Sequence, residues 1–264
     1  MRPACRAGHN PVMCFDHDSR PPILPIEGGA LDAQDVTLES ADGTRFMAYL
    51  AHAAEPTGAG MVVLPDVRGL HAYYRDLALR FAEHGIDAIA IDYFGRTAGI
   101  GDRGPDFDYA PHVPETTYEG LRADVTAAVE HLRAETGVER VFTVGFCMGG
   151  RLAFLSDGFG LGVAGVIGFY GWPTGPSRNG TPAPADVAST FEAPVLGLFG
   201  GADQGIGQEA VQAFDDALTG AAIEHRILTY EGAPHSFFDR KHEEFAEASA
   251  AAWDEVLAFT GVNR

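Results

Sequence analysis

The hydrophobic residues of this chain fall into short apolar runs that alternate with longer amphipathic stretches. This alternation is typical of buried parallel strands joined by crossover helices. The apolar runs predict strands over residues 60–64, 88–91, 141–144, 163–169, 195–199 and 224–230. The amphipathic stretches predict helices over residues 73–84, 117–136, 149–156, 207–219 and 242–259. Right-handed crossovers would place these helices on both faces of one sheet.

Two further strands precede this series. Residues 36–39 and 45–51 flank the turn pair Asp42-Gly43, which predicts an antiparallel hairpin at the start of the sheet. The sequence therefore predicts an α/β fold, a three-layer sandwich with a mostly parallel central sheet and an antiparallel N-terminal hairpin. We expect residues 35–264 to form a single domain. Residues 1–34 are expected to form an extended N-terminal arm, because the prolines near residues 21–25 disfavour both helix and ladder.

Composition narrows the classes of partner. A chain of 264 residues with 46% hydrophobic content is within the range of one domain with a large core. The net charge of −19 repels nucleic acid and anionic membranes, so we expect neither as a partner. No apolar segment approaches the roughly 20 residues of a membrane helix, and the N-terminus lacks the apolar core of a signal peptide. A cytoplasmic location is the expectation.

The three cysteines fit a reducing compartment, where one of them can be catalytic. Cys5 and Cys14 flank His9, with His17 just beyond, but their spacing lacks a tight Cys-x-x-Cys pair. We therefore expect no metal site and no cofactor.

The strongest chemical signal is the segment Gly-Phe-Cys-Met-Gly over residues 145–149, which follows an apolar run. A strand, a sharp turn with small neighbours and a helix form a nucleophile elbow, here with cysteine in the usual serine position. Downstream, Asp203 follows one predicted strand and His235 follows the next. Nucleophile, acid, histidine is the chain order of the α/β-hydrolase fold. The order predicts Cys147 as nucleophile, His235 as base and Asp203 as the residue that orients the imidazole.

These motifs, together with Leu-Pro-Asp at residues 64–66, Ile-Asp-Tyr-Phe-Gly-Arg at 91–96 and Pro-His-Ser-Phe at 234–237, resemble the dienelactone hydrolase family. The resemblance covers about residues 35–259. It implies that Asp66 contacts the thiol and helps to ionise it, the alternative being a turn or capping aspartate. It also implies that Arg96 binds a substrate carboxylate, the alternative being a surface salt bridge.

Other residues complete the predicted site. The loop after the strand that ends at Leu64 normally supplies one oxyanion-hole amide, so the backbone N–H groups of Val67 and Met148 are expected to form the hole. Arg240 could share the task of Arg96, and Ser236 lies beside the histidine in sequence.

Two long connections, residues 94–116 and 171–192, leave the carboxyl ends of predicted parallel strands. Ligands bind at that edge of open α/β sheets, and long loops there are often functional. These loops are candidates for the pocket walls, although each residue in them could simply pack on the surface. The polar and aromatic candidates are Tyr109, His112, Trp172 and Arg178.

The sequence thus predicts a hydrolase that cleaves the ester bond of a small lactone or ester, through a thioester on Cys147. The resemblance implies a carboxymethylenebutenolidase-like activity and a carboxylate-bearing substrate. A non-hydrolytic ligand-binding protein and a thiol-based acyltransferase or isomerase are the alternatives on the same fold. A monomer or a small homo-oligomer is expected.

Overall fold

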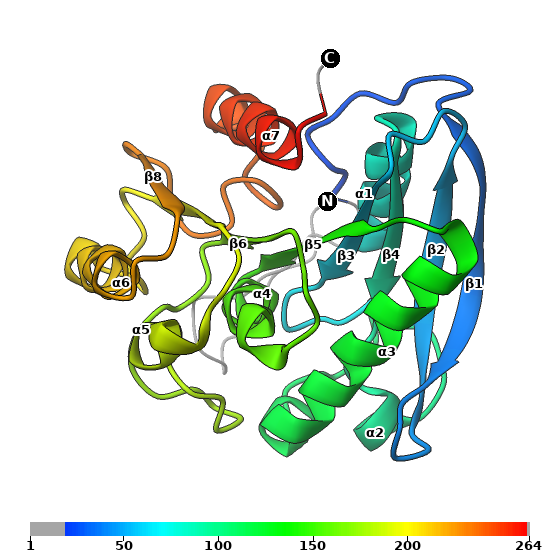
Figure 1. Cartoon of the computed structure of the whole chain (residues 1–264), viewed down its shortest axis with the longest axis horizontal. Coiled ribbons are helices and arrows are strands. Elements are labelled where there is room, and N and C mark those ends of the chain that lie inside the picture. The colour runs from blue at the N-terminus through cyan, green and yellow to red at the C-terminus, as the bar shows by residue number, and fades with distance from the viewer. Residues whose placement is uncertain (1–18, 263–264) are drawn as a thin grey trace, which may run out of the picture.

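The computed structural model describes residues 19–262. Its eight strands form a single sheet, with helices on both of its faces (Figure 1). The strands are β1 (Ala30–Glu39), β2 (Arg45–Ala53), β3 (Ala59–Leu64), β4 (Ile86–Ile91), β5 (Arg140–Phe146), β6 (Gly165–Phe169), β7 (Val195–Gly200) and β8 (His225–Tyr230). The longer helices are α1 (Ala72–Glu83), α3 (Tyr118–Thr136), α4 (Met148–Ser156), α6 (Gln208–Gly220) and α7 (Ala246–Thr260), and the one-turn helices are α2 (Gly95–Ala98) and α5 (Pro184–Val187).

The strand order is β1-β2-β4-β3-β5-β6-β7-β8. β1 pairs antiparallel with β2, and β2 pairs antiparallel with β4, whereas all later neighbours are parallel. The first hairpin turns at Gly43, which adopts a φ of 83°. Asp42 stabilises the turn by accepting a hydrogen bond of 3.0 Å from the Thr44 amide. This arrangement confirms the predicted three-layer α/β-hydrolase fold.

The central strands are buried on both faces, which explains their continuous apolar runs. In β3, Met61 and Val63 belong to the core that includes residues of α1 and α7, while Val62 and Leu64 belong to the core that includes residues of α3. α1 and α7 lie on one side of the sheet, with α3 and α4 on the other (Figure 1). The sheet edge that carries the site is therefore held by packing from both sides.

Two boundaries differ from the sequence prediction by more than two residues. β1 begins at Ala30, inside the segment expected to be an extended arm. The sequence does not predict this first part of the strand, because residues 30–35 are mostly exposed and show no hydrophobic alternation. The last helix begins at Ala246 instead of residue 242, because residues 236–245 form successive turns after the predicted histidine. Cys5 and Cys14 lie outside the described residues.

The carboxyl ends of the parallel strands collect the chemically relevant residues, as in other open α/β sheets. Asp66 follows β3, Cys147 follows β5, Asp203 follows β7 and His235 follows β8. None of the helices within residues 19–262 is long and apolar enough to cross a membrane.

Candidate active site

Cys147 occupies a sharp turn between β5 and α4. Its φ of 57° and ψ of −113° are strained for a residue that carries a side chain. Its amide donates a 3.0 Å hydrogen bond to the Phe169 carbonyl, and its carbonyl accepts the first helical bond from Arg151. A Cβ on Gly145 would collide with the Gly149 backbone, so the turn requires a glycine there. This is the backbone geometry of a nucleophile elbow.

His235 and Asp203 form a hydrogen-bonded pair beside this elbow. Asp203 Oδ2 lies 2.7 Å from His235 Nδ1, and the Asp203 side chain is only 1% exposed. The other Asp203 oxygen accepts the amides of Gly205 and Ile206 at 2.8 and 3.1 Å. Asp203 therefore stabilises the turn before α6 with one oxygen and orients the imidazole with the other.

The second ring nitrogen, His235 Nε2, is buried and has no hydrogen-bond partner of good geometry within residues 19–262. Burial alone would lower the pKa of His235, but the hydrogen bond to Asp203 and the interaction with the Cys147 sulfur raise this pKa to about 10. These interactions therefore favour the protonated imidazole beside Cys147. The aromatic rings of Tyr170 and Trp172 pack on the imidazole, with centroids 4.9 and 4.7 Å away.

Backbone amides lie on either side of the elbow. Met148 is the first residue of α4, so its amide precedes the hydrogen-bond ladder of the helix. A Cβ on Gly149 would collide with the carbonyls of Leu64 and Pro65, which shows how closely α4 approaches the loop that carries Val67. The Val67 amide donates no hydrogen bond within the described chain. Both amides are thus free to donate to a ligand, as an oxyanion hole requires.

Asp66 is bound by Arg68. Arg68 Nε donates to the two Asp66 oxygens at 3.0 and 2.9 Å, and the Arg68 amide donates to Oδ1 at 2.9 Å. Burial would raise the pKa of Asp66, but the charge and hydrogen bonds of Arg68 lower it below the ordinary value. The structure thus pairs Asp66 with a guanidinium, and no hydrogen bond joins Asp66 to the Cys147 sulfur within residues 19–262.

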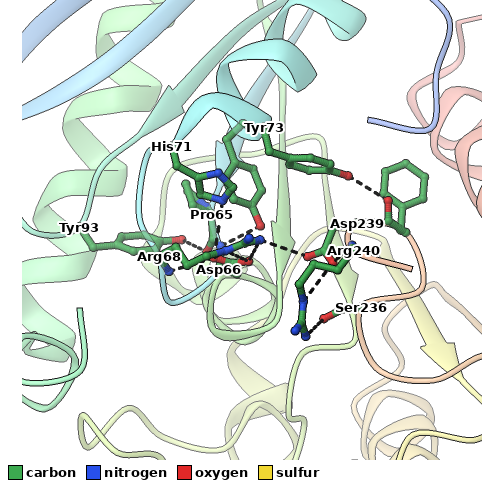
Figure 2. Close-up of polar contacts among 11 residues, drawn as sticks. Pro65, Asp66, Arg68, His71, Tyr73, Tyr93, Ser236, Asp239 and Arg240 are labelled. Carbon is green, nitrogen blue, oxygen red and sulfur yellow. Dashed lines mark hydrogen bonds and ion pairs between the residues drawn. The ribbon is translucent and has the colours of Figure 1, made fainter. Parts of the chain in front are cut away.

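A second buried carboxylate, Asp239, approaches the same guanidinium (Figure 2). Arg68 Nη2 lies 3.6 Å from Asp239 Oδ2, and the two side chains are 3% and 0% exposed. Burial and the negative charge of Asp66 raise the pKa of Asp239 to about 6. We call Asp66, Arg68 and Asp239 the buried ion cluster.

Arg240 and Ser236 lie next to this cluster, on the loop that carries His235 (Figure 2). Arg240 Nη2 donates to Ser236 Oγ at 3.0 Å, and its side chain is partly exposed. Ser236 has a φ of 61°, so the backbone directly after the histidine is strained. The structure therefore brings two of the predicted substrate-binding residues to the histidine.

Arg96 is not brought there. Its guanidinium donates to Asp124 at 2.8 Å through Nη2 and to Thr44 at 2.8 Å through Nη1, and it also pairs with Asp42. These partners lie on α3 and on the first hairpin. The expectation that Arg96 faces the substrate is corrected: it makes the ion pair that was the alternative interpretation.

The loop that follows β6 places Trp172 against the imidazole of His235. Trp172 Nε1 donates to the Gly205 carbonyl at 3.1 Å, in the same turn that Asp203 stabilises. The buried Arg151 side chain donates to the carbonyls of Gly175 and Thr181, each at 2.9 Å, and so ties this loop to α4. Arg151 is thus structural.

Other loop candidates divide between the site and the surface. Tyr109 interacts electrostatically with Asp66, Arg68, Arg240 and Cys147, which places it near the site. His112 stacks on Phe107 at 5.4 Å, and Arg178 is exposed.

The model of the dienelactone hydrolase family matches residues 46–262, which is most of the chain. The chain belongs to the dienelactone hydrolase family. A relative from Salmonella typhimurium, assigned as a carboxymethylenebutenolidase, is 31% identical over 90% of both chains. A relative from Bradyrhizobium, assigned as a 2-oxo-3-(5-oxofuran-2-ylidene)propanoate lactonase, is 29% identical over 82% of this chain and 90% of its own.

Solved structures agree with this family assignment. The crystal structure of a protein from Klebsiella pneumoniae, assigned as a dienelactone hydrolase, superposes with a TM-score of 0.75 at 27% identity. The match covers 88% of this chain and all of that one. Membership of the dienelactone hydrolase family confirms the expectation of a lactone or ester hydrolase.

The sequence does not identify two residues that the structure places beside the site, Arg68 and Asp239. Arg68 lies two positions after Asp66, and Asp239 directly precedes Arg240. The available signal was a basic residue two positions after an acidic one in a turn, but such pairs are common at surfaces. Only the structure shows that both side chains are buried.

No three metal-ligating side chains converge within residues 19–262. A surface hollow lies between β1 and α3 and is lined by Leu38, Arg122 and Ala127 among others. It contains none of the residues of the candidate active site.

Proposed function

We propose that this protein hydrolyses a small ester or lactone through a Cys147–His235–Asp203 triad and a thioester intermediate. The observation that carries the proposal is the elbow conformation of Cys147, with a φ of 57°, next to an imidazole that Asp203 holds at 2.7 Å. A partly buried nucleophile in a strained turn, combined with an oriented base, is the arrangement that nucleophilic catalysis needs.

In the first half-reaction, the thiol proton resides on His235 and the sulfur attacks the ester carbonyl carbon. The carbonyl oxygen becomes negative and accepts hydrogen bonds from the amides of Val67 and Met148. The tetrahedral species then collapses, and the C–O bond to the leaving group breaks. His235 Nε2 gives its proton to that oxygen, and a thioester remains on Cys147.

The second half-reaction requires His235 to act as a base. A pKa of about 10 would prevent this at neutral pH, but part of that value comes from the interaction with the Cys147 sulfur. A thioester carries no negative charge, so acylation removes this contribution and lowers the pKa of His235. The neutral imidazole can then take a proton from water, whose oxygen attacks the thioester. The acid product leaves, and the proton on His235 restores the resting pair.

The substrate class rests on Arg240 and on the relatives. Arg240 is a partly exposed cation beside His235, in a chain with a net charge of −19. A guanidinium binds a carboxylate through charge-assisted hydrogen bonds. The relatives assigned as carboxymethylenebutenolidase and as a lactonase have names that denote lactone substrates. We therefore propose a small lactone or ester that bears a carboxylate, with Arg240 and Ser236 at its anionic end and Trp172 beside the reacting carbonyl.

The decisive test is a pH-stat screen of aryl esters, enol lactones and dienelactones, with the Cys147→Ala variant as control. The proposal expects acid release by the wild type alone, and it expects iodoacetamide to abolish turnover with one label, on Cys147. Thermal stabilisation by these compounds without acid release would favour the ligand-binding alternative. Turnover that depends on an added thiol or alcohol would favour an acyltransferase. Full activity of Cys147→Ala would refute the triad.

A further inference from the structure

The hydrogen bonds and ion pairs of the buried ion cluster within residues 19–262 run among its own members and to the loops around them, and none of them joins the cluster to Cys147. Asp66, Arg68 and Asp239 have side chains that are 5%, 3% and 0% exposed. We propose that Arg68 is a positioning residue that fixes the Val67 amide of the oxyanion hole relative to His235. This inference rests on the proposed function.

The first step of the argument is that Arg68 closes a turn around Val67. The Arg68 amide and Arg68 Nε both donate to Asp66, so both the backbone and the side chain of Arg68 connect the residues on either side of Val67. The Gly69 amide also donates to the Asp66 carbonyl at 3.1 Å. These bonds leave the Val67 peptide little rotational freedom.

The second step is that the chain before this turn is fixed by buried phenols. The Asp66 amide donates to Tyr74 Oη at 3.0 Å, and Tyr93 Oη donates to the Pro65 carbonyl at 2.8 Å. Both tyrosines are fully buried. The turn around Val67 is therefore attached to α1 and to the chain after β4.

The third step is that Arg68 extends from this turn to the loop of His235 (Figure 2). Its Nη2 lies 3.6 Å from Asp239, four residues after the histidine. The Asp239 loop is held in turn by Tyr73, whose hydroxyl donates to the Phe238 carbonyl at 2.9 Å, and by Ser249 of α7, which donates to the Phe237 carbonyl. One guanidinium thus links two loops that come from opposite parts of the sequence.

The energetic reasoning favours a positioning role over a stabilising one. Placing two carboxylates and one guanidinium in the interior costs desolvation energy, and such clusters are often no more stable than apolar side chains of equal volume. What they provide is geometry, because a planar guanidinium holds its partners in fixed directions. An oxyanion-hole donor is sensitive to such geometry, since its hydrogen bond must reach an atom that moves during the reaction.

The experiment compares two reactions of the same thiol. Alkylation by iodoacetamide forms no oxyanion, whereas acylation by p-nitrophenyl acetate and addition to an aryl trifluoromethyl ketone both do. The variants are Arg68→Lys and Asp239→Asn, with Asp124→Asn as the matched control. Asp124 is also a buried aspartate paired with an arginine, but it lies on α3.

We expect Arg68→Lys and Asp239→Asn to reduce kcat for acylation by about tenfold, a fraction of the loss seen when an oxyanion donor is removed outright, with little change in KM. Ketone affinity should fall in parallel, while the alkylation rate stays within about twofold of the wild type. Asp124→Asn should change none of these. Unchanged acylation, or acylation and alkylation that fall together, would overturn the inference.

The experiment distinguishes failure of this inference from failure of the proposed function. A wild type that shows no Cys147-dependent turnover refutes the hydrolase proposal, yet the ketone and iodoacetamide still report on the hole and on the thiol separately. If Arg68→Lys does not fold, Asp239→Asn decides alone, because asparagine keeps the oxygen that accepts the Arg240 amide.

Discussion

The protonation of His235 can be measured directly, and we predict how it changes when Cys147 is replaced. Its pKa of about 10, against an ordinary value of 6.5, corresponds to about 5 kcal/mol of preferential interaction with the protonated imidazole. This is a net effect: burial lowers the pKa of His235, whereas Asp203 at Nδ1 and the Cys147 sulfur raise it. The Cys147→Ala substitution removes one of them and leaves the 2.7 Å bond to Asp203 intact. We expect the proton affinity of His235 to fall at least tenfold, which is about 1.4 kcal/mol.

The measurement is a ¹H–¹⁵N NMR titration of the histidine rings from pH 5 to pH 11. The chain has 10 histidines, so His235→Gln is used to assign the signal. Cys147→Ser serves as an intermediate case, because a hydroxyl can bond to the imidazole but carries no charge. A wild-type midpoint near 6.5, or a midpoint that is the same in Cys147→Ala, would refute the reasoning. The account of how His235 turns from acid into base would then fail with it.

Three other predictions follow from the same geometry. Hydrolysis of alkyl esters should decline as the pH rises through about 10, because His235 loses the proton that the alkoxide needs, whereas acylation by p-nitrophenyl esters should not decline there. Asp239→Asn should raise the free energy of unfolding at pH 7.5, because burial and the charge of Asp66 disfavour the ionised carboxylate. The pKa of Asp239 is raised to about 6, so its stabilising contribution is complete below its unfolded value and is lost as the pH rises through 6. Urea titrations should therefore show no increase in the free energy of unfolding near pH 3.5. An increase of the same size at every pH would contradict this prediction. Arg240→Met should lower kcat/KM for carboxylate-bearing esters by about 1 to 3 kcal/mol relative to neutral ones, whereas Arg96→Met should leave that ratio unchanged. Equal losses on both kinds of ester would show that Arg240 is structural.

The sequence could locate Cys147, Asp203 and His235 at one edge of the sheet because each of these residues has a local signal. Cys147 lies between required glycines, and Asp203 and His235 each follow an apolar run that ends a strand. Parallel strands end at one edge of the sheet, so these local signals determine a common location in space. The same logic predicted nearly all strand and helix positions, since the buried runs and amphipathic stretches follow from simple periodicity.

The partners of the arginines could not be predicted in this way. Arg96 pairs with Asp124, which is 28 positions away on a helix, and Arg68 reaches Asp239, 171 positions away. The chain has 37 acidic residues and 18 basic ones, so every arginine has many candidate partners. Choosing among them requires the crossing geometry of the loops, which periodicity does not encode. The resemblance to the family assigned Arg96 by position, and the position alone did not determine where its side chain points.

The charges around Cys147 explain how such an acidic chain can accept an anionic ligand. Close to the thiol, three carboxylates face three cations: Asp66, Asp203 and Asp239 against Arg68, Arg240 and His235. The charges of these six side chains therefore cancel, and the proposed thiolate of Cys147 is the remaining charge of the resting site, although the chain as a whole carries −19. Arg68 and His235 have close carboxylate partners, and Arg240, which is partly exposed, lies 3.7 Å from Asp239 Oδ1 through Nε and donates to the Ser236 hydroxyl through Nη2. A substrate carboxylate that displaced Ser236 from Arg240 would add one negative charge beside a guanidinium, and the distance from Arg240 to the triad would then set the size of the acid that can react.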